Sequence, residues 1–570
     1  MLNNKKIVAI IPARGGSKGI PRKNARLLAG NPLLAYTIIN ALKSEYIDHV
    51  YVSTDCPVLS EIALKFGAKI IHREQQLAKD DVGIDEVIVH AVNHLENNIN
   101  SFFDIIISVQ ATSPFISSKS IDLGIEKCVK NEFDTVVSVT NDPHLQWGFN
   151  SQGDTIPLYE ERKNRQYLKK RFKETGGFVV CHRQILETKT RFGKNSSLFE
   201  VTKEESVDID DRFDWWLAEK TLLRKKICFH VIGSKHDGLG HVYRALTIAD
   251  RIMDHEIHFI VNEESDLAIL KIKSHLYSYT ICKKGEELET IINKAPDLVI
   301  NDILNTDFEY MNTLRSQGIA TINFEDLGKG STIADIVINE LYDFYPYPKN
   351  DKVFQGSHVC CLRSEFFHTN PKEYSPKVTN IFILIGATDP EGITLQVLKW
   401  IDELEGNWTI TVILGLGDDH EQLIRNFAHT STKKITIIKD TPIVSKYMKE
   451  ADIAITAAGR TLYELTSLGI PMIAMASTKR ELSHSLIHNS FGVISLGLWK
   501  DVNKEKFHDI FLQLLNSNLL RHKMRKALLQ DNLHKGIENV IDIIHDTIKS
   551  LNNKPIESTS FMEYIETTKP

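Results

Sequence analysis

Short apolar runs alternate with amphipathic stretches along most of the chain. Residues 6–11, 49–53 and 104–110 are apolar at almost every position, which is typical of strands buried on both faces of a sheet. Residues 32–43 and 59–66 carry apolar positions at helical spacing. This strand–helix alternation predicts an α/β fold with mainly parallel sheets that helices cover on both sides.

The alternating pattern starts afresh twice. The first set of elements closes with an aromatic-rich helix at 213–225, and the composition around 343–352 changes to Tyr, Pro and Asn, as in a connector. The sequence therefore predicts a first domain at 1–225, a second domain with two α/β lobes at 226–375 and 376–552, and a loose polar tail at 553–570. At roughly 150 residues per domain, the length of 570 residues suggests three or four folded units.

Composition excludes several classes of protein. The 68 Lys and Arg residues against 74 Asp and Glu give a net charge of −6, which argues against a nucleic-acid partner bound through a global basic field. The seven scattered cysteines form no CxxC pair, so we expect a reducing compartment without a disulfide framework or structural zinc. No uncharged apolar run reaches about 18 residues, and the run at 7–11 is too short for a signal peptide. We therefore expect a cytoplasmic protein without a membrane partner.

The segment after the first predicted strand is rich in glycine and cations. Residues 12–24 read PARGGSKGIPRKN. Glycines allow close approach of a ligand to the backbone, and free amides beside Arg14, Lys18 and Lys23 at a strand's carboxyl end would form a polyphosphate cradle. The spacing fits neither the P-loop nor the Rossmann fingerprint. The alternative is a surface turn with solvated charges.

Two later segments carry further polar groups suited to a nucleotide site. Asp208 and Asp210 alternate in the extended stretch VDID, so both face one side and could bind Mg²⁺ between phosphates. The alternative is that they cap the helix that follows. Gln110, Thr112 and Ser113 follow a buried strand, where ligands bind in parallel sheets, although Ser113 also suits a simple turn.

The glycine–cation loop resembles the nucleotide loop of the CMP-sialic acid synthetase family, cytidylyltransferases that activate nonulosonic acids. Further segments follow in the family's order: STD at 53–55, HR at 72–73, QATSP at 110–114, RQ at 165–166, TGG at 175–177 and VDID at 207–210. The resemblance spans about residues 5–225. It implies a Rossmann-like nucleotidyltransferase domain with a mixed, mainly parallel sheet.

The resemblance also implies roles for individual residues. Arg14, Lys18 and Lys23 would hold the triphosphate as catalytic residues. The implied nucleotide-binding residues are Gly15, Gly16, Ser17, Asn24, Ser53, Asp55, Arg73, Gln110, Thr112 and Ser113. The implied sugar-binding residues are Arg165, Gln166 and Gly176, and the implied metal ligands are Asp208 and Asp210.

The implied reaction transfers CMP from CTP to a nine-carbon 2-keto acid sugar and releases pyrophosphate, with Mg²⁺ as cofactor. The segment at 175–178 departs from the patterns of both the sialic acid and the pseudaminic acid enzymes, so the sugar stays open. Asp208, Asp210 and the complete glycine–cation loop count against an enzyme for 3-deoxy-manno-octulosonate. Residues 143–170 correspond to an arm that crosses a dimer in the family, so we expect a homodimer.

The second half carries its own glycine-rich turns at strand ends. Gly240 and His241 open a helix after the strand at 226–232, and the helix dipole favours the neutral imidazole of a general base. A plain helix cap is the alternative role for His241. Residues 386–388 and 459–461 offer amides and hydroxyls to a diphosphate, and Glu464 could hold a ribose.

These segments resemble the UDP-sugar hydrolase of pseudaminic acid biosynthesis, which has a GT-B-like fold. The matching stretches are GLGHVYR at 238–244, LRSEF at 362–366, IGATD at 385–389 and GRTLYE at 459–464. The resemblance implies a catalytic His241. The UDP-sugar site it implies contains Gly240, Arg244, Gly386, Thr388, Asp389, Gly459, Arg460, Thr461 and Glu464. Because Ile303 replaces a histidine of the hydrolase, a glycosyltransferase and a non-catalytic nucleotide-sugar binding module stay open as alternatives.

Overall fold

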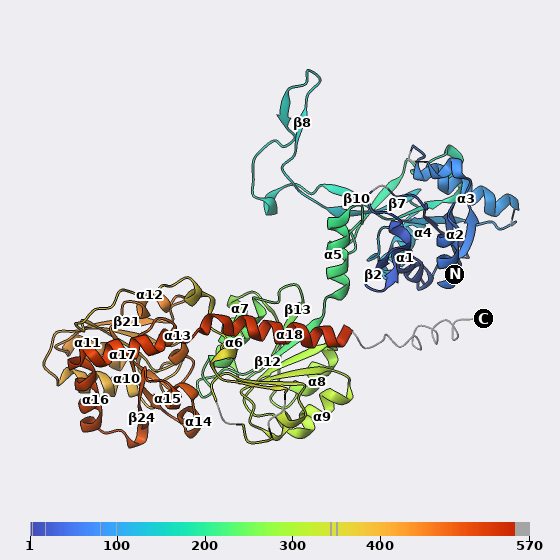
Figure 1. Cartoon of the computed structure of the whole chain (residues 1–570). Helices are drawn as coiled ribbons and strands as arrows, with labels where there is room; N and C mark the ends of the chain where they lie inside the picture. The colour runs from blue at the N-terminus through green and yellow to red at the C-terminus, as the bar shows by residue number, and fades with distance from the viewer. Residues whose placement is uncertain are drawn as a thin grey trace. The chain divides into compact units, whose positions relative to one another are not determined.

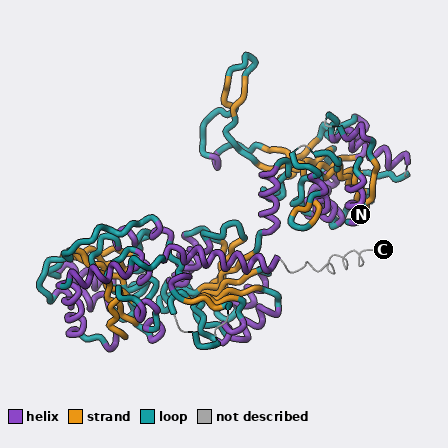
Figure 2. The backbone as a smooth tube through the Cα atoms, viewed as in Figure 1, coloured by secondary structure: helices purple, strands orange, loops and turns teal. Residues whose placement is uncertain are grey.

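The computed structural model describes residues 2, 4–17, 19–79, 81–98, 100–342, 345–348 and 351–552. It contains two compact units, Met1–Leu223 and Arg224–Pro570, which are described separately below (Figure 1, Figure 2). Lys18 and the tail predicted at 553–570 lie outside the described residues. Among the residues described, no helix is both long enough and apolar enough to cross a membrane.

Unit 1 is built on a seven-stranded mixed sheet in the order β11-β7-β10-β6-β1-β4-β5. Only β10 runs antiparallel to its neighbours in this sheet, which confirms the predicted mixed, mainly parallel arrangement. The strands are β1 (Ile7–Pro12), β4 (His49–Thr54), β5 (Lys69–His72), β6 (Ile105–Val109), β7 (Thr135–Asn141), β10 (Phe172–His182) and β11 (Ser196–Glu200). The helices are α1 (Leu33–Leu42), α2 (Pro57–Lys65), α3 (Ile84–Asn98), α4 (Ser118–Lys130) and α5 (Arg212–Leu223).

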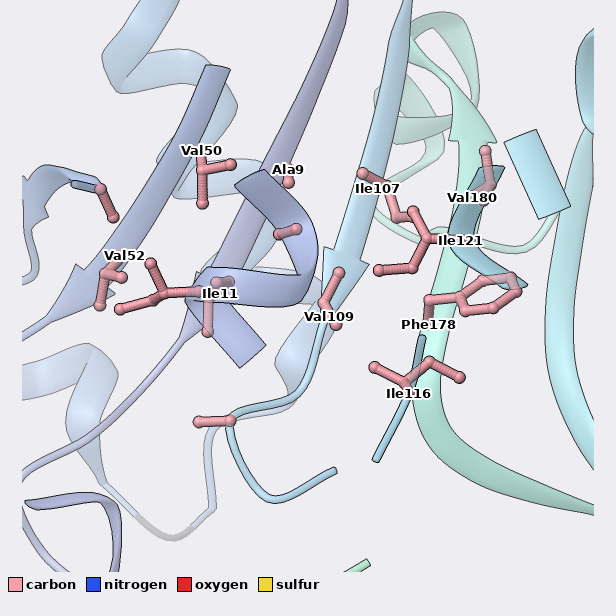
Figure 3. Packing of buried hydrophobic residues seen from close by; sticks show 14 of the residues in the cluster. Ala9, Ile11, Val50, Val52, Ile107, Val109, Ile116, Ile121, Phe178 and Val180 are labelled. Atoms are coloured by element: carbon pink, nitrogen blue, oxygen red, sulfur yellow. The ribbon is translucent and has the colours of Figure 1, made fainter. Parts of the chain in front are cut away.

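The core of unit 1 lies on both faces of this sheet because its central strands alternate between two apolar layers. On β1, Ala9 and Ile11 pack in one cluster with Ile107 and Phe178 (Figure 3), whereas Val8 belongs to the cluster on the other face. Every residue from 7 to 11 is fully buried, because apolar side chains cover both faces of the sheet at β1. This burial holds the carboxyl ends of β1 and β6 in fixed positions.

A hairpin arm extends from the body of unit 1 (Figure 1). It contains the antiparallel strands β8 (Trp147–Phe149) and β9 (Thr155–Pro157) and a short 3₁₀ turn at Arg165–Tyr167. Trp147 is 57% exposed, Phe149 76% and Tyr167 68%. The arm therefore carries three large apolar side chains that remain exposed in the single chain.

Unit 2 contains two lobes, each with its own parallel sheet. In the first lobe the order is β14-β13-β12-β15-β16-β17-β18, and in the second it is β21-β20-β19-β22-β23-β24. The first-lobe strands are β12 (Lys226–Val231), β13 (Glu256–Asn262), β14 (Ser278–Cys282), β15 (Leu298–Asp302), β16 (Ala320–Phe324), β17 (Ile336–Asn339) and β18 (Val353–Gln355). The second-lobe strands are β19 (Asn380–Leu384), β20 (Thr409–Leu414), β21 (Lys434–Lys439), β22 (Ile453–Ala457), β23 (Met472–Ala476) and β24 (Val493–Leu498). The predicted two-lobed α/β architecture is thereby confirmed.

Helices cover the sheets of both lobes, and the last one returns across them. The first-lobe helices are α6 (Gly240–Ala249), α7 (Asp266–Ser274), α8 (Glu287–Lys294) and α9 (Phe308–Ser316). The second-lobe helices are α10 (Ile393–Asp402), α11 (Glu421–Thr430), α12 (Ser445–Met448), α13 (Thr461–Ser467), α14 (Lys479–Leu482), α15 (Ser485–Asn489), α16 (Lys504–Asn516) and α17 (Asn518–Leu528). The final helix, α18 (Gly536–Asn552), follows them in the chain but returns to the first lobe (Figure 1). Its Ile537, Val540 and Ile544 belong to the core of that lobe.

Candidate active sites

A cavity of about 420 Å³ opens in unit 1 at the carboxyl ends of β1 and β6. It brings together segments that lie far apart in the sequence. Of the predicted site residues, those that line it are Arg14, Ser17, Lys23, Asn24, Arg73, Gln110, Thr112 and Asp210. The cavity therefore collects the predicted loop, the end of β6 and one predicted metal ligand.

Asp55 binds the backbone of the glycine–cation loop. The backbone N–H of Gly15 donates to Asp55 Oδ1 at 3.0 Å, and Arg73 Nη2 lies 3.6 Å from the same oxygen. Asn24 Nδ2 donates to the carbonyl of Arg14 at 3.2 Å. Burial lowers the pKa of the Arg73 guanidinium, and the Asp55 carboxylate partly opposes this. These contacts fix the backbone of the loop at Arg14 and Gly15 and place the Arg73 guanidinium beside it.

The other predicted glycines and serines differ in their surroundings. A Cβ on Gly15 would lie 2.8 Å from Cβ of Cys56, whereas one on Gly16 would meet nothing within 4 Å. Ser53 and Ser113 are fully buried, and neither hydroxyl has a hydrogen-bond partner among the described residues. Neither serine lines the cavity.

The two predicted metal ligands have contrasting environments. Asp208 is mostly buried next to Thr112, and burial raises the pKa of its carboxyl, with Asp210 adding to the effect. Its Oδ1 has no hydrogen-bond partner among the described residues. Asp210 is exposed, and its Oδ1 lies 3.2 Å from Lys23 Nζ. The pair therefore offers one desolvated carboxylate and one accessible carboxylate.

Gly176 lies against Gln110, which lines the cavity. It has a φ of 70°, and a Cβ at this position would lie 2.9 Å from Gln110 Nε2. Arg165 and Gln166 lie instead on the exposed arm, where Arg165 Nη2 contacts Asp142 Oδ1 at 3.4 Å. Neither lines the cavity of its own chain.

A second cavity, of about 430 Å³, lies between the two lobes of unit 2. Side chains and backbone from both lobes line it, including the turn at 236–240 and the strand ends at 384–388 and 413–416. The predicted residues that line it are Gly240, Gly386, Thr388, Gly459, Arg460, Thr461 and Glu464. Its position at the carboxyl ends of parallel strands is the usual place for a ligand in α/β proteins.

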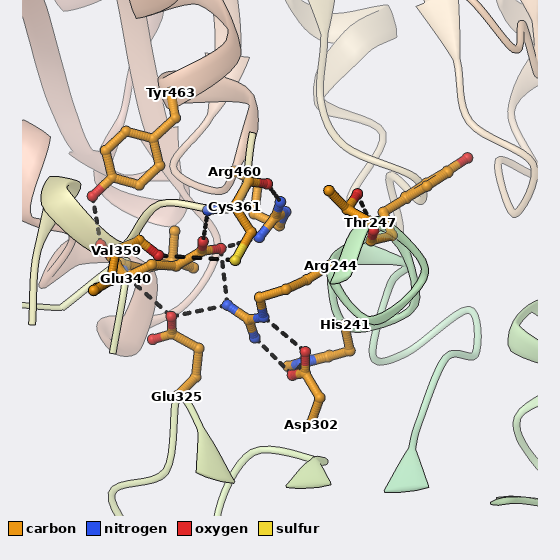
Figure 4. A network of polar contacts seen from close by, with 12 residues as sticks. His241, Arg244, Thr247, Asp302, Glu325, Glu340, Val359, Cys361, Arg460 and Tyr463 are labelled. Carbon is orange, nitrogen blue, oxygen red and sulfur yellow. Dashed lines mark hydrogen bonds and ion pairs between the residues drawn. The ribbon is translucent and has the colours of Figure 1, made fainter. Parts of the chain in front are cut away.

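His241 is paired with a buried carboxylate that sequence reasoning did not select. Its Nδ1 lies 2.6 Å from Asp302 Oδ1, at the end of β15 (Figure 4). Burial alone would raise the pKa of Asp302, but Arg244 and His241 together lower it to about 2. An ionised partner on Nδ1 orients the imidazole and leaves Nε2 available to accept a proton. His241 does not itself line the cavity, whereas Gly240 beside it does.

Arg244 lies at the centre of a buried ionic network rather than on the cavity wall. Its guanidinium donates to Asp302 at 2.7 and 2.6 Å, to Glu325 at 3.0 Å and to Glu340 at 2.9 Å (Figure 4). Arg460 from the second lobe also contacts Glu340. Three carboxylates therefore face two guanidinium groups, and Glu340 joins the lobes.

Two further predicted residues are placed by local hydrogen bonds. Glu464 Oε1 accepts from Arg363 Nε at 2.7 Å, and both side chains line the cavity. Asp389 is buried and does not line it. Its carboxylate accepts from the backbone N–H groups of Ile393 and Thr394 at 2.9 and 2.7 Å, which caps α10. The family segment LRSEF contains Arg363 and was the available signal for its place in the site.

Two family models match the chain. The cytidylyltransferase model matches residues 8–205, and the model of the glycosyltransferase family 28 C-terminal domain matches residues 380–541. The matches fall on unit 1 and on the second lobe of unit 2. They confirm the resemblance of the first half and, for the second half, a glycosyltransferase-type domain.

Curated relatives align with the first half and in one case beyond it. N-acylneuraminate cytidylyltransferase A of Danio rerio is 33% identical over 228 residues, which is 39% of this chain and 52% of that protein. N-acylneuraminate cytidylyltransferase of Escherichia coli O18:K1:H7 is 32% identical over 329 residues, which is 54% of this chain and 76% of that protein. CMP-N,N'-diacetyllegionaminic acid synthase of Legionella pneumophila is 31% identical over 224 residues, which is 38% of this chain and 96% of that protein.

The extent of these matches differs between relatives. The chain spans only about half the length of the Danio rerio protein, but most of the length of the two bacterial ones. The chain covers more than two thirds of both bacterial proteins at more than 30% identity, and this shows the family. The chain belongs to the cytidylyltransferase family that includes the N-acylneuraminate cytidylyltransferases, and its second unit carries a glycosyltransferase family 28 C-terminal domain.

Proposed function

We propose that unit 1 transfers CMP from CTP to a nonulosonic acid, a nine-carbon 2-keto acid sugar. The anomeric oxygen of the sugar would attack the α-phosphorus, the bond from that phosphorus to the bridging oxygen would break, and pyrophosphate would leave. The observation that carries this proposal is the cavity in which Arg14 and Lys23 of the glycine–cation loop lie together with Gln110 from the end of β6. Catalysis in such a site consists mainly of positioning and charge neutralisation.

The carboxylates fit a magnesium ion. Asp208 offers a buried oxygen without a hydrogen-bond partner among the described residues, and burial raises the pKa of its carboxyl although Thr112 and Lys23 partly oppose this. Asp210 adds an accessible carboxylate, and Mg²⁺ is typically bound by one or two carboxylates together with substrate phosphates. When bound, the ion would neutralise charge on the phosphates. Lys23, which contacts Asp210 in this structure, would then be free to contact the triphosphate.

We also propose that unit 1 acts as a homodimer and that the arm completes the site of the partner. Arg165 and Gln166 lie on the arm and do not line the cavity of their own chain. The exposed Trp147, Phe149 and Tyr167 on the same arm provide apolar surface for the contact.

The first test is pyrophosphate release from CTP with sialic, legionaminic and pseudaminic acids in parallel, with the other nucleoside triphosphates and 3-deoxy-manno-octulosonate as controls. We expect CTP and at least one nonulosonic acid to support turnover. Release only with 3-deoxy-manno-octulosonate, or with no keto acid at all, would contradict the assignment.

A mixing experiment tests the arm. Asp208→Asn and Arg165→Ala should each be inactive alone. If Arg165 acts in the partner's site, one of the two sites in each mixed dimer is intact, so an equal mixture should recover about a quarter of wild-type activity. No recovery after subunit exchange would place Arg165 in its own chain's site.

For unit 2 we propose hydrolysis of a UDP-linked amino sugar in the cleft between the lobes. Asp302 orients His241, whose Nε2 would accept a proton from water as the water oxygen attacks the anomeric carbon and UDP leaves. Gly459, Thr461 and the N-terminus of α13 would face the diphosphate, and Glu464 would accept from the ribose hydroxyls.

The matching glycosyltransferase family 28 domain supports a second candidate, transfer of the sugar to an acceptor hydroxyl instead of water. The purified protein should therefore be incubated with UDP-amino sugars, with and without sugar acceptors. UDP release that needs no acceptor and is lost in His241→Ala supports hydrolysis. Release only with an acceptor supports transfer, and tight UDP-sugar binding without turnover supports a non-catalytic binding module.

A further inference from the structure

A third cavity, of about 770 Å³, lies in the first lobe of unit 2. It is lined near the carboxyl ends of β12, β13 and β15 by His230, Asn262, Glu287 and Tyr310, among others. None of its lining residues lines the cleft between the lobes. The proposed UDP-sugar site therefore does not account for this cavity.

A buried chain of hydrogen bonds runs from Asp326 to His230 at this cavity. Asp326 determines which group of each pair is the donor and which is the acceptor. The Asp326 carboxylate accepts from the N–H groups of Thr306 and Gly328 at 3.0 and 2.8 Å and from Thr306 Oγ1 at 2.6 Å. It also accepts from Asn323 Nδ2 at 2.7 Å. Two backbone N–H groups and the Thr306 hydroxyl donate to this carboxylate, so Asp326 acts as an acceptor, and the amide of Asn323 presents its NH₂ to Asp326 and its oxygen away from it.

The same direction continues to His230. Asn323 Oδ1 accepts from Asn301 Nδ2 at 2.8 Å, and Asn301 Oδ1 accepts from the Tyr310 hydroxyl at 2.7 Å. Since Tyr310 uses its proton on Asn301, its oxygen must accept from His230 Nδ1 at 2.9 Å. His230 thus has its proton on Nδ1 and a lone pair on Nε2.

His230 is only 5% exposed, and it is one of the residues that line the cavity. Burial lowers the pKa of this histidine to about 4, so the ring is neutral at physiological pH. A buried, neutral imidazole with a fixed tautomer is a directed hydrogen-bond acceptor. It seeks a ligand that donates an O–H or N–H.

The rest of the cavity also favours a donor. Glu287 accepts from Asn262 Nδ2 at 3.0 Å and from the backbone N–H of Gly285. Burial would raise the pKa of Glu287, but these hydrogen bonds lower it, so its carboxylate is ionised. Asp307 and Glu309 add two more carboxylates, and no Lys or Arg is found among the described residues that line the cavity. A phosphate or carboxylate ligand would be repelled.

A metal ion does not explain these acceptors. Within the described part of the chain, the one group of three side chains able to converge on an ion is Asp254, His255 and His545. None of these lines the cavity.

We propose that this cavity is a second ligand site of unit 2, which binds a hydroxyl-rich sugar without a phosphate or carboxylate. One sugar hydroxyl donates to Nε2 of His230, and another donates to the carboxylate of Glu287. The site is separate from the UDP-sugar cleft and does not depend on the activity proposed for that cleft.

The tautomer can be measured on the wild-type protein with ¹⁵N-labelled histidine by two-bond ¹H–¹⁵N NMR. We expect the proton of His230 on Nδ1 between about pH 6 and 8, because the neutral ring donates to Tyr310. A proton on Nε2, or a charged ring at pH 6, would overturn the relay and the proposal with it.

Binding is then measured on the full chain by saturation-transfer difference NMR with N-acetylglucosamine, mannose and N-acetylglucosamine 6-phosphate. UDP is present throughout, so that any nucleotide site in the cleft is occupied. We expect the two neutral sugars to bind and the phosphate to bind at least fivefold more weakly. Equal binding of the phosphate, or no binding of either neutral sugar at high millimolar concentration, would refute the site.

Four variants test where the sugar binds. Glu287→Gln should weaken sugar binding at least fivefold, whereas Glu289→Gln on the exposed face of the same helix should not change it. His230→Phe should abolish binding, and if that variant fails to fold, Glu287→Gln and the wild-type tautomer still decide. His241→Ala should leave sugar binding intact, which separates this site from the one proposed for UDP-sugars. Unchanged affinity in Glu287→Gln would place the sugar elsewhere.

Discussion

Lys23 Nζ lies 3.2 Å from Asp210 Oδ1, which joins the glycine–cation loop to the segment that carries both predicted metal ligands. Lys23 also donates to the backbone carbonyl of Ile209. The lysine side chain is 11% exposed and the aspartate side chain 78%, so the pair lies at the mouth of the cavity. A cation there is available both to Asp210 and to an incoming triphosphate.

Replacing Lys23 should therefore affect the substrate more than the fold. An ion pair with such an exposed partner contributes about 0–1 kcal/mol. The hydrogen bond to the Ile209 carbonyl adds about 1.5 kcal/mol, so Lys23→Gln should lower the free energy of unfolding by no more than about 2–3 kcal/mol. Loss of the cation should raise KM for CTP at least tenfold, measured by pyrophosphate release. Lys119→Gln, on an exposed position of α4, is the matched control and should behave as wild type. An unchanged KM for CTP in Lys23→Gln would remove Lys23 from the triphosphate site.

Asp208→Asn should separate stability from activity. The substitution keeps the volume of the side chain and removes a buried charge whose pKa burial has raised. Because the folded protein holds the proton of Asp208 more tightly than the unfolded chain does, ionisation lowers stability once the pH exceeds the ordinary carboxyl pKa. The variant should therefore be at least as stable as wild type at pH 7, by thermal unfolding.

The same variant should lose CMP transfer by roughly 100-fold or more, because a carboxylate that would bind the divalent cation is gone. Added Mg²⁺ should restore little of it. Asp211→Asn is the control, since asparagine caps a helix as well as aspartate does. Wild-type turnover and magnesium dependence in Asp208→Asn would eliminate Asp208 as a ligand.

Gly176→Ala should report on the position of Gln110. Gly176 and Gly153 both have φ values in the left-handed region, 70° and 87°, so an alanine at either position costs about 1–2 kcal/mol. A Cβ at 176 would lie 2.9 Å from Gln110 Nε2, whereas one at 153 would meet nothing within 4 Å. Both variants should lose similar stability, but only Gly176→Ala should lower CTP turnover, by about tenfold. Equal turnover of the two variants would show that the Gly176–Gln110 contact does not matter to catalysis.

Glu325→Gln should change how the stability of unit 2 depends on pH. Burial raises the pKa of Glu325 to about 7, since the nearby charge of Arg244 only partly offsets it and Glu340 adds to it. At low pH the carboxyl is protonated in both folded and unfolded chains. As the pH rises from the ordinary value of 4.5 to about 7, only the unfolded chain ionises readily, so stability falls and stays low above pH 7.

This fall in the free energy of unfolding with rising pH amounts to about 3 kcal/mol at most, and it should be absent in Glu325→Gln. Chemical denaturation of the two proteins at pH 5 and pH 8 measures it. Glu289→Gln, an exposed change, should keep the wild-type pH dependence. A glutamine variant with the same slope as wild type would show that Glu325 is ionised throughout.

Local sequence could predict many of the polar residues that line the cavity of unit 1, for a simple geometric reason. Arg14, Lys23, Gln110 and Thr112 follow apolar strands, and in a parallel sheet the carboxyl ends of neighbouring strands meet at one edge. Residues that follow such strands therefore lie close together at that edge, and this does not depend on the helices between the strands. Arg165 and Gln166 follow no central strand but belong to an arm, so their sequence positions do not state which cavity they reach.

In unit 2 the sequence was less informative because the decisive contacts are long-range. Arg244 was predicted at the UDP-sugar site from its place after His241. It is instead neutralised by carboxylates 58, 81 and 96 residues away. The partner of His241 is one of these, and no local pattern links them.

By itself the sequence determined the strand–helix alternation, the two-lobed second half, the glycine–cation loop and the family, because these depend on local periodicity and short motifs. Only the tertiary structure decided that Arg244 is a buried ionic centre, that His241 pairs with Asp302, and that α18 returns to the core of the first lobe. Each of these features depends on which segments, distant in the sequence, pack against one another and become buried. That burial, and the charge pairing that it forces, is a property of the packed chain and not of any stretch of it.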